Sequence, residues 1–169
     1  MRRTDLLRWL GFSLLVVALD RVAKYIVVQV LEVGERIPVW PFFSWIHLQN
    51  EGAAFSFLSG AGGWQRWLFV VIAIGFSVYL IYEMRRLPAE RKLQGWAFAL
   101  ILGGAWGNLI DRIDHGRVVD FVLVHYQHHY FPAFNVADSA IFLGAVAWIV
   151  LMFRDARRES SARAEANAE

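Results

Sequence analysis

The amino-acid sequence predicts an all-α membrane protein, with four transmembrane helices and a small extracytoplasmic β-sheet between the first two spans. Hydrophobic residues make up 57% of the chain, charged residues only 19%, and the mean hydropathy is +0.40. This composition lies outside the soluble globular class. The apolar residues also gather in separate segments that basic residues flank. We therefore predict one integral membrane domain over residues 1–169.

The first apolar segment follows a basic N-terminus, as the apolar region of a secretory signal peptide does. However, Asp20, Arg21 and Lys24 stand where a cleavage site would need small residues. We therefore expect an uncleaved first span over about residues 9–31.

The other apolar segments cover about residues 64–84, 95–110 and 136–153. They are long enough, or nearly so, to cross about 30 Å of hydrocarbon. Four spans put both termini on one side, and the positive-inside rule places that side in the cytoplasm. The basic residues behind this assignment are Arg2, Arg3 and Arg8, then Arg85, Arg86, Arg91 and Lys92, then Arg154, Arg157 and Arg158. The polar tail over 154–169 is expected to be a frayed helix or disordered, on the cytoplasmic side.

The outer segment over residues 32–63 carries the predicted β-structure. An extended aromatic stretch from Phe42 to Gln49 is followed by a turn at Asn50, and then by a second stretch from Ala53 to Leu58. This pattern predicts a hairpin-like sheet. Nearby tryptophans favour a position at the membrane interface, and the run from Ser59 to Gly63 is typical of a flexible connector.

Charged residues of different spans are predicted to gather toward the outer leaflet. Because a helix rises about 1.5 Å per residue, Asp20 and Lys24 lie about 18 and 24 Å above Arg8, and Asp111 about 28 Å above Lys92. A charge near mid-membrane costs roughly 2.5 to 3.5 kcal/mol, so the charges of the first span are expected to face a protein or water-filled interior. Asp20 and Lys24 are one turn apart and can pair. An ion pair that holds the bundle together and a direct part in catalysis both remain open for them.

The third span combines small residues with a polar outer end. Gly103, Gly104 and Gly107 have a spacing that lets neighbouring helices approach closely, so they predict packing. Asn108 and Arg112 follow at the outer end, where polar residues are ordinary. Alone, this end of the helix indicates little about function.

Two carboxylates are the candidates for chemistry. Asp120 lies in an apolar stretch near the membrane surface, and Asp138 lies in the first turn of the fourth span, where Asn135 could cap the helix with it. That cap would explain Asp138 without a catalytic role. Two carboxylates about 4 Å apart at an effective dielectric of about 20 would repel by roughly 4 kcal/mol, so one would stay protonated. Such a pair can activate water and protonate a peptide carbonyl.

Short groups of residues in a fixed order carry a family resemblance over nearly the whole chain. These groups are Asp20 with Lys24; Asn50, Gly52, Ala53, Ala54 and Phe55; Gly103, Gly104, Gly107, Asn108, Asp111 and Arg112; Val119, Asp120 and Phe121; and Phe134, Asn135, Ala137 and Asp138. Each group alone is weak, but the ordered set is specific. The chain resembles the lipoprotein signal peptidases, the signal peptidase II family of bacterial membrane aspartyl peptidases.

The resemblance implies an endopeptidase of the bacterial inner membrane that cuts prolipoproteins before a diacylglyceryl-modified cysteine. It implies that Asp120 and Asp138 form the catalytic dyad on the extracytoplasmic side, under a sheet that cradles a substrate arriving sideways from lipid. Residues expected to bind substrate or support the dyad are Asn50, Gly52, Asn108, Arg112, Asn135 and Ala137. Those expected to be structural are Asp20, Lys24 and Asp111. The expected partners are prolipoproteins and membrane lipid, with no metal, cofactor or nucleic acid, and the protein is expected to be a monomer.

Two residues depart from the family pattern. Arg21 stands where the family often has glutamine, which adds a charge beside Asp20 and Lys24 and leaves their pairing open. Glu51 occupies a variable position inside the Asn-Gly motif and could alter the preferences of the substrate loop.

Other functions fit parts of the sequence. A metal-dependent hydrolase is suggested by His125, His128 and His129, with His47 and His115 also expected outside, although the helical His-Glu-x-x-His spacing is missing. Ionisable residues inside spans also occur in ion- or proton-coupled transporters. A membrane scaffold would leave the outward gathering of polar residues unexplained.

Overall fold

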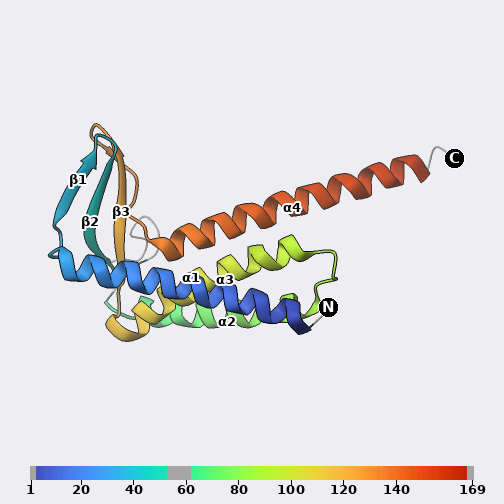
Figure 1. Ribbon diagram of the computed structural model, residues 1–169, viewed down its shortest axis with the longest axis horizontal. Coiled ribbons are helices and arrows are strands. Elements are labelled where there is room, and N and C mark those ends of the chain that lie inside the picture. Colours follow the sequence, from blue (N-terminus) through green and yellow to red (C-terminus); the bar gives the residue numbers. More distant parts are fainter. Residues whose placement is uncertain (1–2, 53–61, 167–169) are drawn as a thin grey trace.

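The computed structural model describes residues 3–52 and 62–166 and is mostly helical (Figure 1). The helices are α1 (Arg3–Val30), α2 (Gln65–Arg86), α3 (Lys92–His115) and α4 (Val136–Ala166). They run alongside one another, and the sheet stands at the end of the molecule where α1 ends and α4 begins (Figure 1). The tail predicted as a frayed helix or disordered continues α4 as far as Ala166.

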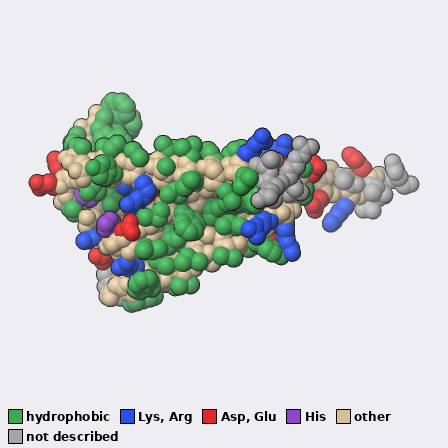
Figure 2. Space-filling model, turned by 60° about the horizontal axis from the view of Figure 1, so that its bottom comes forward, with side chains coloured by type: hydrophobic (Ala, Val, Ile, Leu, Met, Phe, Trp, Pro, Cys, Tyr) green, Lys and Arg blue, Asp and Glu red, His purple; other side chains and the backbone are tan. Residues whose placement is uncertain are grey.

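Apolar composition explains the helices. In the part of the chain that the structure describes, three helices are long and apolar enough to cross a membrane: Gln65–Arg86, Lys92–His115 and Val136–Glu165. Helix α1 has 28 residues but carries more charges. On the face shown in Figure 2, hydrophobic side chains cover the length of the molecule, and charged side chains gather toward its ends. This distribution is that of a protein surrounded by lipid along its middle.

Helix α3 is the centre of the bundle and packs against each of the other three helices. A Cβ atom on Gly103 would lie 2.7 Å from the backbone oxygen of Ser13 in α1. A Cβ atom on Gly104 would collide with the backbone oxygen of Ala137 in α4. The predicted close approach of helices at these glycines is confirmed.

Substitution of Gly104 by alanine is expected to destabilise the protein by about 1–3 kcal/mol, because overpacking forces the backbone of α4 away from α3. Gly75 of α2 is the matched control, since a Cβ atom there would have nothing within 4 Å. Gly75→Ala should stabilise its helix by up to about 1 kcal/mol. Urea unfolding in detergent micelles measures both changes, and equal stability of the two variants would contradict the close packing at Gly104.

Within the described residues, the sheet has four antiparallel strands in the order β1-β2-β3-β4. They are β1 (Arg36–Trp40), β2 (Phe43–Asn50), β3 (Val118–Tyr126) and β4 (His129–Tyr130). The prediction of a sheet confined to the segment between the first two spans is wrong, because β3 and β4 follow α3. The hairpin partner of β2 is the preceding strand β1, whereas the expected stretch from Ala53 to Leu58 lies outside the described residues.

The pairing of β2 with β3 places one aspartate at the end of the bundle. Leu48 lies opposite Asp120, and Asn50 lies opposite Val118. Beyond β3, an isolated bridge joins Val122 to Phe134, which brings the chain back to the start of α4. The sheet therefore holds Asp120 next to the first turn of α4.

Candidate active site

Asp120 is buried where β2, β3 and the start of α4 meet. Only 3% of its surface is exposed. The side-chain amide of Asn135 donates to its Oδ1 at 2.7 Å, and that of Asn50 donates to its Oδ2 at 3.1 Å. Both carboxylate oxygens of Asp120 are thus oriented by amides from different elements.

Asp138 lies in the first turn of α4 and caps it together with Asn135. The Asp138 N–H donates to Asn135 Oδ1 at 2.8 Å, and the Asn135 N–H donates to Asp138 Oδ2 at 3.2 Å. This reciprocal pair is a capping box, so the predicted cap is confirmed. The second oxygen, Oδ1, accepts a hydrogen bond from Asn108 Nδ2 at 2.7 Å. Asn135 contacts both aspartates, so the helix cap and the candidate site are one structure.

Lys24 of α1 joins the helices beneath the two aspartates. Its ammonium lies 2.7 Å from Asp20 Oδ2 and 2.7 Å from Asp111 Oδ2, and donates to Asn108 Oδ1 at 3.0 Å. Asp20 in turn accepts the N–H of Ala137 at 2.9 Å. The predicted pairing of Asp20 with Lys24 is confirmed, and it extends to the start of α4.

Arg21 does not disturb that pair. Its guanidinium contacts Asp111 Oδ1 and lies 3.7 Å from Asp114 Oδ2. The other oxygen of Asp111 faces Lys24, so one buried carboxylate is shared by two cations of α1. From the sequence, Arg21 was predicted only to add a charge. The acidic residues Asp111 and Asp114 at the outer end of α3 were a signal for its partners.

Arg112 of α3 holds the end of β2. It donates to the backbone oxygen of Gly52 at 2.9 Å and to that of Asn108 at 3.3 Å. The Gly52 N–H donates to Asn50 Oδ1 at 2.9 Å, which fixes the amide of Asn50 with its nitrogen toward Asp120. The residues expected next in this motif, Ala53, Ala54 and Phe55, lie outside the described residues.

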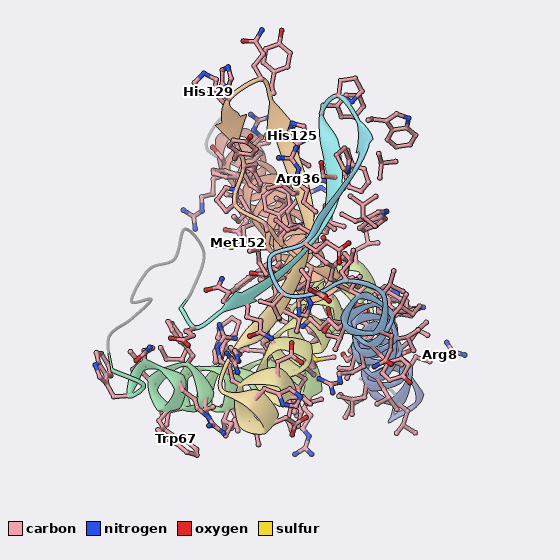
Figure 3. All side chains as sticks on the ribbon, turned by 90° about the vertical axis from the view of Figure 1, so that its left-hand side faces the viewer. Arg8, Arg36, Trp67, His125, His129 and Met152 are labelled. Atoms are coloured by element: carbon pink, nitrogen blue, oxygen red, sulfur yellow. The ribbon has the colours of Figure 1, made fainter. Side chains whose placement is uncertain are left out.

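His128 and His129 are exposed, as expected for an outer loop, whereas two other histidines are placed differently from that expectation. His47 is buried, and its Nδ1 lies 2.9 Å from the backbone oxygen of Leu31 at the end of α1. The Nε2 of His125 lies 2.8 Å from the guanidinium of Arg36 and 3.1 Å from the hydroxyl of Ser44. Figure 3 shows Arg36 and His125 directed toward each other across the sheet. This cluster was missed, since it depends on strand pairing between distant segments.

The surroundings of Asp120 favour its protonated form. Burial is the main cause and raises the pKa of the carboxyl from 3.8 to about 7, with repulsion from Asp138 acting in the same direction. The hydrogen bonds from Asn50 and Asn135 act in the opposite direction. A carboxyl with this pKa can hold or release a proton near neutral pH.

Comparison with known proteins gives the family. Residues 12–154 match the family described as Signal peptidase (SPase) II. The chain belongs to this family. It is 50% identical over 145 residues to the lipoprotein signal peptidase of Acinetobacter baumannii, covering 86% of this chain and 82% of the relative. It is 52% identical to the lipoprotein signal peptidase of Pseudomonas fluorescens, covering 88% of each.

A solved structure shares the fold. The bacterial membrane enzyme determined by the in meso method at 2.3 Å resolution is 31% identical to this chain, with a TM-score of 0.80. The match covers 88% of this chain and 89% of the solved one. Membership of the signal peptidase II family makes the chain a membrane hydrolase of the aspartic peptidase type, and the resemblance predicted from the ordered motifs is confirmed. A transporter and a metal hydrolase are thereby set aside.

Proposed function

We propose that this signal peptidase II removes the signal peptide from prolipoproteins by cutting before a diacylglyceryl-modified cysteine, with Asp120 and Asp138 as its catalytic dyad. The observation that carries the proposal is the position of Asn135, whose side-chain amide donates to the carboxylate of Asp120 and whose backbone N–H donates to the carboxylate of Asp138. Relatives that cover most of the chain are lipoprotein signal peptidases. The two aspartates are then the acid and base that an aspartic peptidase needs.

In the proposed mechanism the dyad shares one proton. The ionised carboxylate takes a proton from a water molecule, whose oxygen attacks the carbonyl carbon of the scissile peptide bond. The protonated carboxyl gives its proton to the carbonyl oxygen, which forms a tetrahedral diol. Collapse of the diol breaks the C–N bond, and a proton from the dyad goes to the leaving amine. The pKa of Asp120, raised to about 7, supports the presence of that shared proton.

The orientation of the amides around the dyad is set by donors that bond their side-chain oxygens. Asn108 Oδ1 accepts from the Lys24 ammonium, so its nitrogen must face Asp138 and donate. Asn135 Oδ1 accepts the N–H of Asp138, so its nitrogen faces Asp120. The proposed role of Lys24 and Asn108 is therefore to hold Asp138 in place for water activation.

We infer that α1 spans the bacterial inner membrane together with the three more apolar helices, which gives four spans. The dyad then lies outside the cytoplasm. Asp20 and Lys24 are 0% and 3% exposed, so these two charges of α1 are hidden from lipid. The start of α1 and the end of α4 lie at the end of the molecule away from the sheet (Figure 1). Both termini are then cytoplasmic, and the single chain carries all proposed site residues, as expected for a monomer.

Cleavage by the purified protein in detergent tests the proposed function. We expect a diacylglyceryl-modified precursor to be cut on the N-terminal side of its modified cysteine, and the same precursor without the lipid to stay intact. Mass spectrometry of the products locates the cut. No cleavage, or a cut elsewhere in the modified precursor, would contradict the proposal.

Activity is expected to fall as the pH rises above about 7, because the dyad then loses its shared proton. The folded protein holds the Asp120 proton more tightly than the unfolded chain. The stability from this group is therefore complete below its ordinary pKa of 3.8 and is lost as the pH rises through about 7. Asn50→Ala removes a hydrogen bond to the ionised form, so the alkaline limb of kcat/KM should move to higher pH. If the alkaline limb of kcat/KM stayed at the same pH or moved to lower pH, the assignment of the shared proton to Asp120 would be contradicted.

A further inference from the structure

An apolar pocket of about 350 Å³ lies between the outer half of α1 and the sheet. Its lining includes Ala23, Ile26 and Val30 of α1, Ile37 of β1, Trp45 of β2 and Phe121 of β3. The volume is in the range of small-molecule sites. The described residues that line it have aliphatic or aromatic side chains, so the pocket suits a hydrocarbon ligand.

Two lining residues of the pocket adjoin candidate site residues along the chain. Ala23 precedes Lys24, and Phe121 follows Asp120, so each wall residue is about 3.8 Å along the backbone from a site residue. The register of β2 against β3 shifts between Trp45 and Leu48, and the Phe121 N–H bonds to the backbone oxygen of Phe134 instead. The pocket and the dyad therefore adjoin the same irregular part of β3.

The pocket opens toward the surroundings of α1. Ile26 is 54% exposed and Val30 is 64% exposed, although both contribute to the lining. Figure 3, which views the molecule from the sheet end, shows β1 and β2 standing over the end of α1. A chain lying in the membrane along α1 would meet the pocket before it reached water.

We propose that this pocket, called the acyl pocket below, binds one acyl chain of the substrate's diacylglyceryl group. The inference rests on the proposed function and adds a place for the lipid. An acyl chain that leaves the bilayer for the pocket gains little from the hydrophobic effect, because both surroundings are apolar. Its contribution is to position the linked cysteine beside Asp120, so the effect appears in KM for long-chain substrates.

The first test compares two otherwise identical precursors, one with palmitoyl and one with butanoyl chains. Ala23→Phe fills the acyl pocket, and Ala18→Phe makes the same change at an exposed position of α1 that is outside the lining. We expect Ala23→Phe to raise KM for the palmitoyl precursor at least about 10-fold with kcat unchanged, because pockets discriminate even one methylene group to about this extent. The KM of Ala23→Phe for the butanoyl precursor should stay as in wild type. The KM of Ala18→Phe should stay as in wild type for both precursors.

A second test locates the chain directly. The Asp120→Asn protein is mixed with a precursor whose acyl chains end in a diazirine, and in parallel with a phospholipid that carries the same group. We expect the precursor to label the α1 and β2 residues of the acyl pocket, and the unlabelled precursor to suppress labelling by the phospholipid there. The Ala23→Phe substitution, which fills the acyl pocket, should abolish labelling of these residues by the precursor.

The outcomes separate the two proposals. Cleavage of both precursors with equal KM changes in Ala23→Phe, or labelling of the pocket by phospholipid alone, would overturn the acyl pocket and leave the peptidase function standing. Failure of wild type to cleave either precursor would contradict the proposed function and the acyl pocket together.

Discussion

Asp138→Asn is expected to lower kcat for prolipoprotein cleavage by about 10³-fold or more, because an amide can neither take a proton from water nor return it. Asparagine has nearly the same shape as aspartate, although its NH2 group loses the hydrogen bond that Asn108 Nδ2 donates to Asp138 Oδ1. Its side-chain oxygen can still accept the N–H of Asn135, so the start of α4 should remain capped. Loss of activity would then report chemistry and not folding. Single-turnover cleavage of the diacylglyceryl-modified precursor measures it.

Asp155→Asn is the matched control for this variant. Asp155 lies on the same helix near its other end, where it pairs with Arg91 at 3.1 Å. Its activity should equal that of wild type within about twofold, since surface ion pairs contribute little. The same loss is expected for Asp120→Asn. Full activity in either dyad variant, with the unfolding transition unchanged, would rule out the dyad.

Lys24→Met is expected to destabilise the protein by about 3–5 kcal/mol, because removal of one partner from a buried ion pair leaves an uncompensated charge. Lys24 is 3% exposed and lies 2.7 Å from carboxylate oxygens of both Asp20 and Asp111. Methionine fills much of the same volume but carries no charge. Asn108 also loses the donor that fixes its amide, so kcat should fall as well. Denaturant unfolding in micelles gives the stability change.

The exposed Lys92 at the start of α3 provides the control. Lys92→Met makes the same chemical change outside the network and should alter stability by less than about 0.5 kcal/mol. If Lys24→Met were as stable as Lys92→Met, the ion network would not be holding α1 to α3.

The helices could be predicted from the sequence because apolar composition alone determines them. The second span was predicted at about residues 64–84, and α2 is Gln65–Arg86. The third was predicted to end at about residue 110, but α3 continues to His115 and ends where Gly116 adopts a φ of 76°. The polarity of Asp111 suggested that the third span reaches water there, whereas Asp111 is 1% exposed and lies within the ion network. Polarity marks a helix end only when the polar residue faces solvent.

The strand pairing of the sheet and the contacts within the site were harder to predict from the sequence. Strands β2 and β3 are separated by two helices in the sequence, and alternation of residues does not reveal which strands pair. The ordered motifs named Asp120, Asp138 and their neighbours as candidates. They did not show that Asn135 contacts both aspartates, because a hydrogen bond across elements has no signature in spacing.

The cap at the start of α4 has a consequence for biogenesis. Synthesis proceeds from the N-terminus, so Asp120 and its strand are made before Asn135 and Asp138. The capping box that orients Asp138 forms when the first turn of α4 becomes helical, and the hydrogen bond from Asn108 to Asp138 forms when α4 docks on α3. Until that last helix enters the bilayer, the nascent chain has only one of the two proposed catalytic aspartates in place. In the proposed mechanism, completion of membrane insertion is therefore also the step that activates the enzyme.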